Sequence, residues 1–132
     1  MLNSTRILYW TATALIVLET LVGGFADLTH GRTVLFGGPL VTDVLASLGY
    51  PVYVLWIIGI WKILGAVTLA VPGFLRLKEW AYAGMMFDIS GALVSRALAG
   101  DGGFELFLPF VIAALVALSW ALRPAERRLI PA

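Results

Sequence analysis

Four long apolar runs occupy most of the chain, at about residues 7–28, 52–71, 79–98 and 105–122. Each run has about the 20 residues that an α-helix needs to cross roughly 30 Å of hydrocarbon. The runs are continuously apolar and do not alternate with a period of two, which favours helices over the strands of a β-barrel. The sequence therefore predicts an all-α fold, a single domain over residues 1–132 built as a four-transmembrane-helix bundle.

The composition excludes several classes of function. The chain is 61% hydrophobic and 13% charged, whereas a soluble domain is about 25% charged. A net charge of +1 gives no reason to expect a nucleic-acid partner. With no cysteine and a single histidine, His30, no metal, haem or iron–sulfur site is evident. Hydrolase motifs and phosphate-binding glycine loops are also absent from the sequence, so we expect no catalytic activity of its own.

The basic residues predict an orientation in the membrane. With four spans, both termini share a side with the connection between the second and third runs. That side carries six basic residues: Arg6, Arg76, Lys78, Arg123, Arg127 and Arg128. The opposite side carries only Arg32 and Arg96, which predicts that both termini are cytoplasmic. The first apolar run continues past Glu19, so we interpret it as a retained span and not a cleaved leader.

The one long connection, residues 29–50, contains a short amphipathic pattern. Its apolar residues share one helical face: Leu40, Val41, Val44, Leu45 and Leu48. The pattern predicts a short helix in this external loop, lying across the mouth of the bundle or on the lipid surface. A plain packed helix and a functional lid both fit the pattern.

Three of the apolar runs carry a charge near the middle: Glu19, Lys62 and Asp88. At 1.5 Å per residue, Glu19 lies ~18 Å from the inner edge, Lys62 ~15 Å from the outer edge and Asp88 ~13 Å from the inner edge. All three then share about one depth. Opposite charges at one level can pair, and pairing is how such groups become tolerable inside a membrane.

Small residues around these charges indicate that they face the bundle interior: Gly59, Gly65 and Ala66 near Lys62, and Gly84, Gly91, Ala92 and Ser95 near Asp88. Two interpretations stay open, a buried network that fixes helix packing and the lining of a ligand or proton path. The candidate polar core is Glu19, Lys62, Asp88, Trp61, Tyr82 and Ser95.

Four secondary candidates lie near the ends of the runs. Glu79 and Trp80 begin the third run. Arg96 is expected to snorkel to the surface or to pair with Asp101. Asp27 is expected to cap the first helix or to pair with Arg32.

Several stretches resemble the DoxX-like family. They are Gly49-Tyr-Pro, Gly59-Ile-Trp-Lys-Ile-Leu-Gly-Ala66, Leu77-Lys-Glu-Trp-Ala-Tyr-Ala-Gly84, Phe87-Asp-Ile-Ser-Gly-Ala92, Gly100-Asp101 and Leu122-Arg-Pro124. The resemblance extends over most of the chain and implies a small four-helix protein of the bacterial plasma (inner) membrane. The family takes its name from a subunit associated with a thiosulfate:quinone oxidoreductase. One departure is Ser95-Arg96, where such sequences often have Ser-His.

The resemblance and the charged core together lead to one main hypothesis and two alternatives. The main one is a polar intramembrane core that binds a small lipophilic ligand such as a quinone, or that supports a membrane redox complex. The first alternative is a proton-coupled transporter of small molecules that acts as a homodimer. The second is a ligand-free membrane scaffold or assembly factor. The expected partners are the lipid bilayer, a membrane redox protein or a second copy of the chain.

Overall fold

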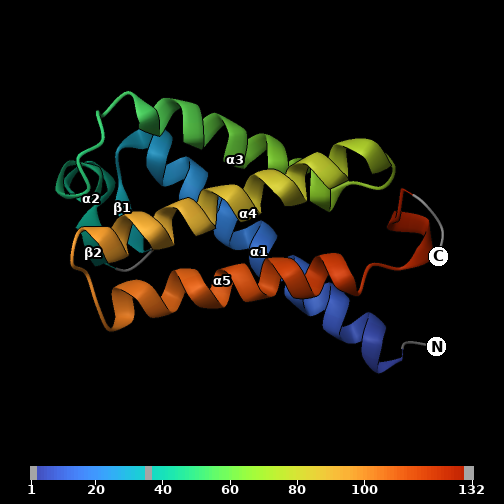
Figure 1. Ribbon diagram of the computed structural model, residues 1–132. Helices are drawn as coiled ribbons and strands as arrows, with labels where there is room; N and C mark the ends of the chain where they lie inside the picture. Colours follow the sequence, from blue (N-terminus) through green and yellow to red (C-terminus); the bar gives the residue numbers. More distant parts are fainter. Residues whose placement is uncertain (1–2, 35–36, 130–132) are drawn as a thin grey trace.

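The computed structural model describes residues 3–34 and 37–129, which form a helical bundle with one small hairpin (Figure 1). In chain order the elements are α1 (Ser4–Thr29), β1 (Arg32–Val34), β2 (Gly37–Leu40), α2 (Val41–Ser47), α3 (Val54–Ala70), α4 (Leu75–Leu98), α5 (Phe104–Ala121) and the 3-10 helix η1 (Ala125–Arg127).

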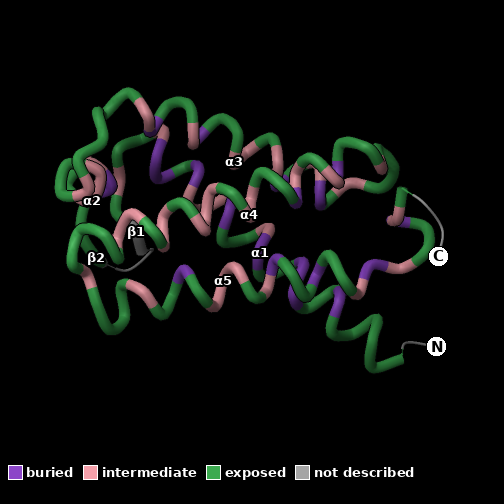
Figure 2. The backbone as a smooth tube through the Cα atoms, in the orientation of Figure 1, coloured by how far each residue is buried: buried purple, intermediate pink, exposed green. Residues whose placement is uncertain are grey.

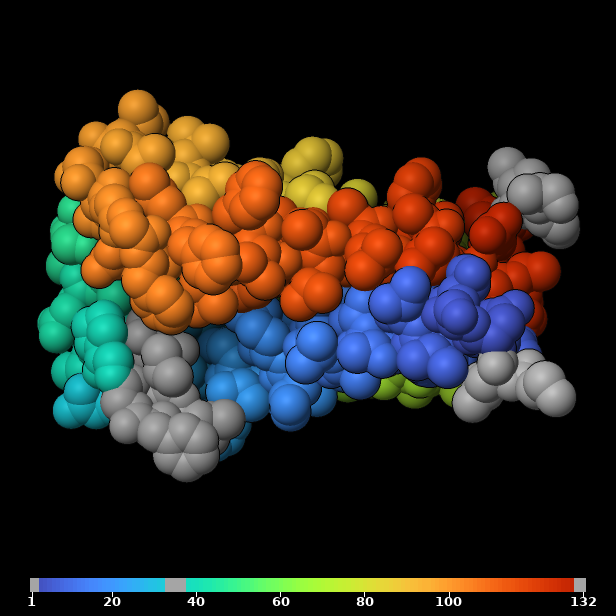
Figure 3. Space-filling view, turned by 90° about the horizontal axis from the view of Figure 1, so that it is seen from below, coloured from blue at the N-terminus to red at the C-terminus, as the bar shows by residue number. Residues whose placement is uncertain are grey.

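The four long helices run lengthwise beside one another and form a closed ring of contacts. In this ring α1 packs on α3, α3 on α4, α4 on α5 and α5 on α1. The antiparallel pair β1–β2 and the helix α2 cover one end of the bundle, here called the hairpin end. The start of α1 and the segment after α5 lie side by side at the opposite end, here called the terminal end (Figure 1 and Figure 3).

Two clusters of buried apolar side chains hold the bundle together. One joins all four long helices and consists of Ile16, Leu69, Tyr82 and Val116. The other lies toward the hairpin end and consists of Ala26, Val41 and Leu55. The buried segments therefore follow the inner faces of the helices, while the outer faces are largely exposed (Figure 2).

The exposed outer faces are strongly apolar. Phe25, Phe87 and Phe110 are 66%, 75% and 63% exposed. A surface of this kind is expected where lipid is the solvent, because apolar contact with acyl chains carries no penalty. Of the described helices, α1 and α5 are long and apolar enough to cross a membrane by length and composition, and α3 is apolar but has 17 residues.

A close approach of α1 and α3 depends on glycine. A Cβ atom on Gly59 would lie 2.8 Å from Cγ of Leu28 and 3.1 Å from the carbonyl oxygen of Gly24. A Cβ atom on Gly24 would in turn lie 3.0 Å from Cβ of Lys62. Both distances to carbon are shorter than normal packing contacts, so the two helices meet at this depth only because both positions lack a side chain.

The four predicted spans correspond to α1, α3, α4 and α5, and their ends differ by at most four residues. The largest difference is the start of α4, which begins at Leu75, so that Lys78 lies within the helix and is buried. The predicted short helix in the long connection is confirmed as α2. The hairpin was not predicted, since its strands have only three and four residues and include Gly38 and Pro39.

Candidate functional site

A cavity of about 690 Å³ lies within the bundle between the two core clusters. Sites for small molecules in proteins are typically about 300–1,000 Å³ and mostly apolar. Apolar side chains form most of its wall, with Val116 from the first cluster and Val41 and Leu55 from the second. The polar lining residues are Glu19, Thr20, Asp27, Lys62, Thr68, Asp88 and Arg96.

Lys62 is the centre of the charged group in the cavity wall. Its Nζ atom lies 2.9 Å from Oδ2 of Asp27 and 3.9 Å from Oδ2 of Asp88. These residues come from α3, α1 and α4, so the ion pairs link three helices. The predicted meeting of Lys62 and Asp88 is confirmed, although Asp27 lies closer to Lys62.

The expected pairing of Asp27 with Arg32 is wrong. Asp27 lies within α1 on the same buried face as Thr20 and Gly24, and this face meets α3. Its carboxylate therefore accepts a hydrogen bond from Lys62. Arg32 instead donates a hydrogen bond of 2.8 Å to the carbonyl oxygen of Gly38 within the hairpin.

Glu19 lines the same cavity but lies outside these ion pairs. Within residues 3–34 and 37–129, no basic group lies within 4.0 Å of its carboxylate. The space beside Gly23 lies between the two groups, because a Cβ atom there would be 3.6 Å from Nζ of Lys62 and 3.8 Å from Oε1 of Glu19. Lys62 is alongside Gly24, five residues beyond Glu19 on α1, which corresponds to ~7.5 Å along a helix axis.

Both tryptophan candidates, Trp61 and Trp80, line the cavity and are also exposed on the outer surface of the bundle. Trp61 of α3 is 68% exposed and Trp80 of α4 is 70% exposed. At the hairpin end Arg96 lines the cavity as well, and its predicted pairing with Asp101 is confirmed at 3.1 Å.

Three other candidates, Ser95, Tyr82 and Glu79, lie outside the cavity. Ser95 shares a hydrogen bond of 2.7 Å with the hydroxyl of Tyr50, which ties the α2–α3 connection to α4. The Tyr82 hydroxyl shares a hydrogen bond of 2.8 Å with Ser119. The expectation that Tyr82 lines the same cavity is therefore wrong, because it points toward α5 instead.

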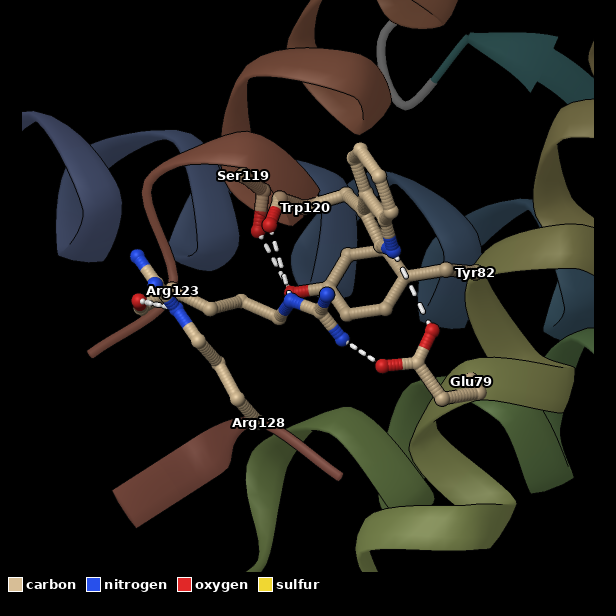
Figure 4. Close-up of polar contacts among 6 residues, drawn as sticks. All are labelled: Glu79, Tyr82, Ser119, Trp120, Arg123 and Arg128. Carbon is tan, nitrogen blue, oxygen red and sulfur yellow. Dashed lines mark hydrogen bonds and ion pairs between the residues drawn. The ribbon is translucent and has the colours of Figure 1, made fainter. Parts of the chain in front are cut away.

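Glu79 belongs to a polar network between α4, α5 and the segment after α5 (Figure 4). Its carboxylate accepts a hydrogen bond of 3.1 Å from Nε1 of Trp120 and another from the guanidinium of Arg123. The Arg123 guanidinium also lies 5.0 Å from the ring centre of Trp120. Glu79 thus fixes the terminal end of the bundle and does not reach the cavity.

Three basic residues that were expected at the cytoplasmic surface are buried at this same end, namely Arg123, Lys78 and Arg127. Lys78, 1% exposed, donates to the carbonyl oxygens of Thr68 and Val71. Arg127, 8% exposed, donates a hydrogen bond of 2.8 Å to the carbonyl oxygen of Leu69. The last carbonyls of a helix have no partner within it, and basic side chains commonly supply one. The signal in the sequence was the position of Lys78 just after the Pro72-Gly73 break.

Comparison with known proteins identifies one family. Residues 11–119 match the DoxX-like family. No curated protein and no solved structure matches the chain.

Proposed function

The chain belongs to the DoxX-like family, and on that premise we propose that its four long helices cross the membrane and that their cavity binds a small lipophilic molecule. A quinone is the candidate ligand. Membership of the family and the apolar helices make this a DoxX-like membrane protein.

The observation that carries the proposal is the position of Lys62, which lies in the wall of a mostly apolar cavity and donates a hydrogen bond to Asp27. An ammonium group has three N–H donors. Lys62 donates to Asp27 at 2.9 Å, and Oδ2 of Asp88, at 3.9 Å, is beyond hydrogen-bond length. A donor therefore remains for the carbonyl oxygen of a ligand. Protein interiors are normally close-packed, so charges that served packing alone would not require a cavity of about 690 Å³ beside them.

The carboxylates around Lys62 have a supporting role in this proposal. Asp27 holds the ammonium in place from α1, and Asp88 approaches it from α4. An ammonium donor forms hydrogen bonds roughly twice as strong as a neutral one.

The orientation of the chain is a further part of the proposal. Arg6, Arg76, Arg123, Arg127 and Arg128 gather at the terminal end. We infer that this end faces the cytoplasm of a bacterial cell, because short loops rich in Arg and Lys are retained on that side. The hairpin end then faces outward.

The test is a titration of decylubiquinone into the protein in lipid nanodiscs, for the wild type and Lys62→Met. Loss of a hydrogen bond from a charged donor costs about 1.5–3 kcal/mol, so the dissociation constant should rise about tenfold or more. Arg76→Met is the matched control, since it removes an exposed basic residue outside the cavity wall.

A second variant separates binding from folding. In Lys62→Met combined with Asp27→Asn, both partners of the closest ion pair lose their charge, so that the Asp27 carboxylate is not left without its partner. It should fold and still bind the quinone weakly. Unchanged affinity in both variants would contradict the role of Lys62. A wild-type protein that does not bind the quinone would contradict quinone binding itself and favour a ligand-free scaffold.

A further inference from the structure

We propose that the cavity opens sideways between α3 and α4, so that its ligand enters from the hydrocarbon of the bilayer and not from water. This inference rests on the proposed function for the identity of the ligand, but the opening itself can be tested without any ligand.

The hairpin end of the cavity is covered. Helix α2 presents Val44, Leu45 and Leu48 to the cavity. Val41, the first residue of α2, and Leu55 of α3 are 5% and 1% exposed. The hydrogen bond between Tyr50 and Ser95 and the ion pair between Arg96 and Asp101 fasten the adjoining connections to α4.

The terminal end of the cavity is filled by packed side chains. Ile16, Leu69 and Val116 are 1%, 1% and 3% exposed, and they meet at this end of the cavity. Lys78 and Arg127 close the bundle beyond them by binding the carbonyl oxygens at the end of α3. In the described residues, a path from water at either end therefore crosses packed side chains.

On the side between α3 and α4, side chains that line the cavity are also exposed at the outer surface. The large apolar side chains that line the cavity and are also exposed all come from these two helices: Ile57, Trp61 and Leu64 of α3, and Leu77 and Trp80 of α4. The apolar lining residues from α2 and α5 are buried or half-buried, and from α1 only polar residues line the cavity, of which Thr20 and Asp27 are buried and Glu19 is exposed. The cavity thus reaches the outer surface along the face between α3 and α4, where the neighbouring medium is lipid.

The position of the opening specifies the class of ligand. A molecule that enters here must first dissolve in the bilayer, so it has an apolar body. Its polar group must reach the Lys62 ammonium, whose side chain is 24% exposed. The site therefore fits a membrane-dissolved amphiphile with a hydrogen-bond acceptor at one end, and a water-soluble metabolite is a poor candidate.

The opening can be tested by electron paramagnetic resonance, and the absence of native cysteine makes single labels straightforward. Gly84 lines the cavity, and a Cβ atom there meets nothing within 4 Å. A spin label on Gly84→Cys in lipid vesicles is compared with one on Phe87→Cys. Phe87 is 75% exposed, lies outside the cavity wall and is within one turn of Gly84 on α4.

Collisions of each label with oxygen, which concentrates in hydrocarbon, and with a water-soluble nickel chelate are then measured. A lateral opening predicts that the label at Gly84 collides with oxygen nearly as often as the label at Phe87, and rarely with nickel. Frequent nickel collisions at Gly84 would show a route from water. Oxygen collisions far below those at Phe87 would show a cavity sealed from the bilayer. Either result would overturn the proposal.

A second arm uses decylubiquinone and distinguishes failure of the opening from failure of the proposed function. Leu64→Cys, at the opening, is labelled with a bulky maleimide, and Leu118→Cys, on α5 outside the cavity wall, is the control. Labelling at Leu64 should slow quinone binding several-fold, whereas labelling at Leu118 should not. Equal rates in both would argue against the opening. Absence of binding in the unlabelled wild type would contradict the proposed function and leave the collision measurement to decide the opening.

Discussion

The two carboxylates that approach Lys62 are not equivalent. Asp27 lies 2.9 Å from the ammonium and its side chain is 8% exposed, whereas Asp88 lies 3.9 Å away and is 37% exposed. Exposed ion pairs contribute little to stability, while removal of one partner of a buried pair leaves an uncompensated charge. Asp27 should therefore account for most of the stabilisation of Lys62, and Asp88 should be the carboxylate that is free to respond to a ligand.

Asp27→Asn should lower the free energy of unfolding by about 2 kcal/mol, because it removes the close charged partner of Lys62. Asp88→Asn should change it by at most about 1 kcal/mol. The two substitutions are chemically matched, and reversible unfolding in detergent micelles measures both. An equal or larger loss for Asp88→Asn would contradict this ranking.

The membership of the charged group could be predicted only in part from the sequence. Charges within apolar runs correctly indicated that Lys62 and Asp88 meet. Counting residues from the ends of the runs could not identify Asp27 as the closest partner. That count assumes parallel helices with known starting points, whereas the backbone of Lys62 lies beside Gly24, ~7.5 Å along α1 from Glu19 and closer to Asp27.

At the scale of helices, the contact between α1 and α3 is the most demanding. Gly24 and Gly59 face each other there without room for a Cβ atom. Small residues near Lys62 predicted such an approach, but the partner glycine on α1 became identifiable only from the packing. By contrast, Gly84 of α4 has open space beside it, since it faces the cavity.

Gly59→Ala should therefore destabilise the protein by about 1–3 kcal/mol, because the new methyl group overpacks against Leu28 and the backbone of Gly24. Gly84→Ala is the matched control. Its methyl group meets nothing, so the substitution should be neutral or should stabilise the helix by up to about 1 kcal/mol. Thermal unfolding measures the stability of both variants. Similar losses of stability at the two positions would exclude close packing of α1 on α3.

The existence and approximate bounds of the long helices could be predicted, because run length and hydropathy determine them. The hairpin could not, since two very short strands carry no periodic signal. The ends of the helices were also only approximate. The buried roles of Lys78 and Arg127 depend on the carbonyl groups at the end of α3, which only the folded chain brings near them.

At the scale of the whole molecule, the four long helices differ in how readily they would enter a membrane. Helices α1 and α5 are long and apolar enough by themselves. Helix α3 has 17 residues, ~25 Å at 1.5 Å per residue, and α4 carries Asp88 near its middle. Helices α3 and α4 are tolerable in lipid because their charged residues have partners in the bundle. Lys62 and Asp88 face one another in the cavity, and Glu79 pairs with Arg123 at the terminal end.

The crossing of α3 and α4 is thus the central claim, and the connection between these helices tests it most directly. A membrane-impermeant maleimide is applied to intact cells that carry either Pro72→Cys, in this connection, or Gly102→Cys, between α4 and α5. Both positions are exposed, and the chain has no other cysteine. Four crossings predict that Gly102→Cys is labelled in intact cells and that Pro72→Cys is labelled only after permeabilisation. Labelling of both positions from outside would mean that only α1 and α5 cross the membrane, and would contradict the account.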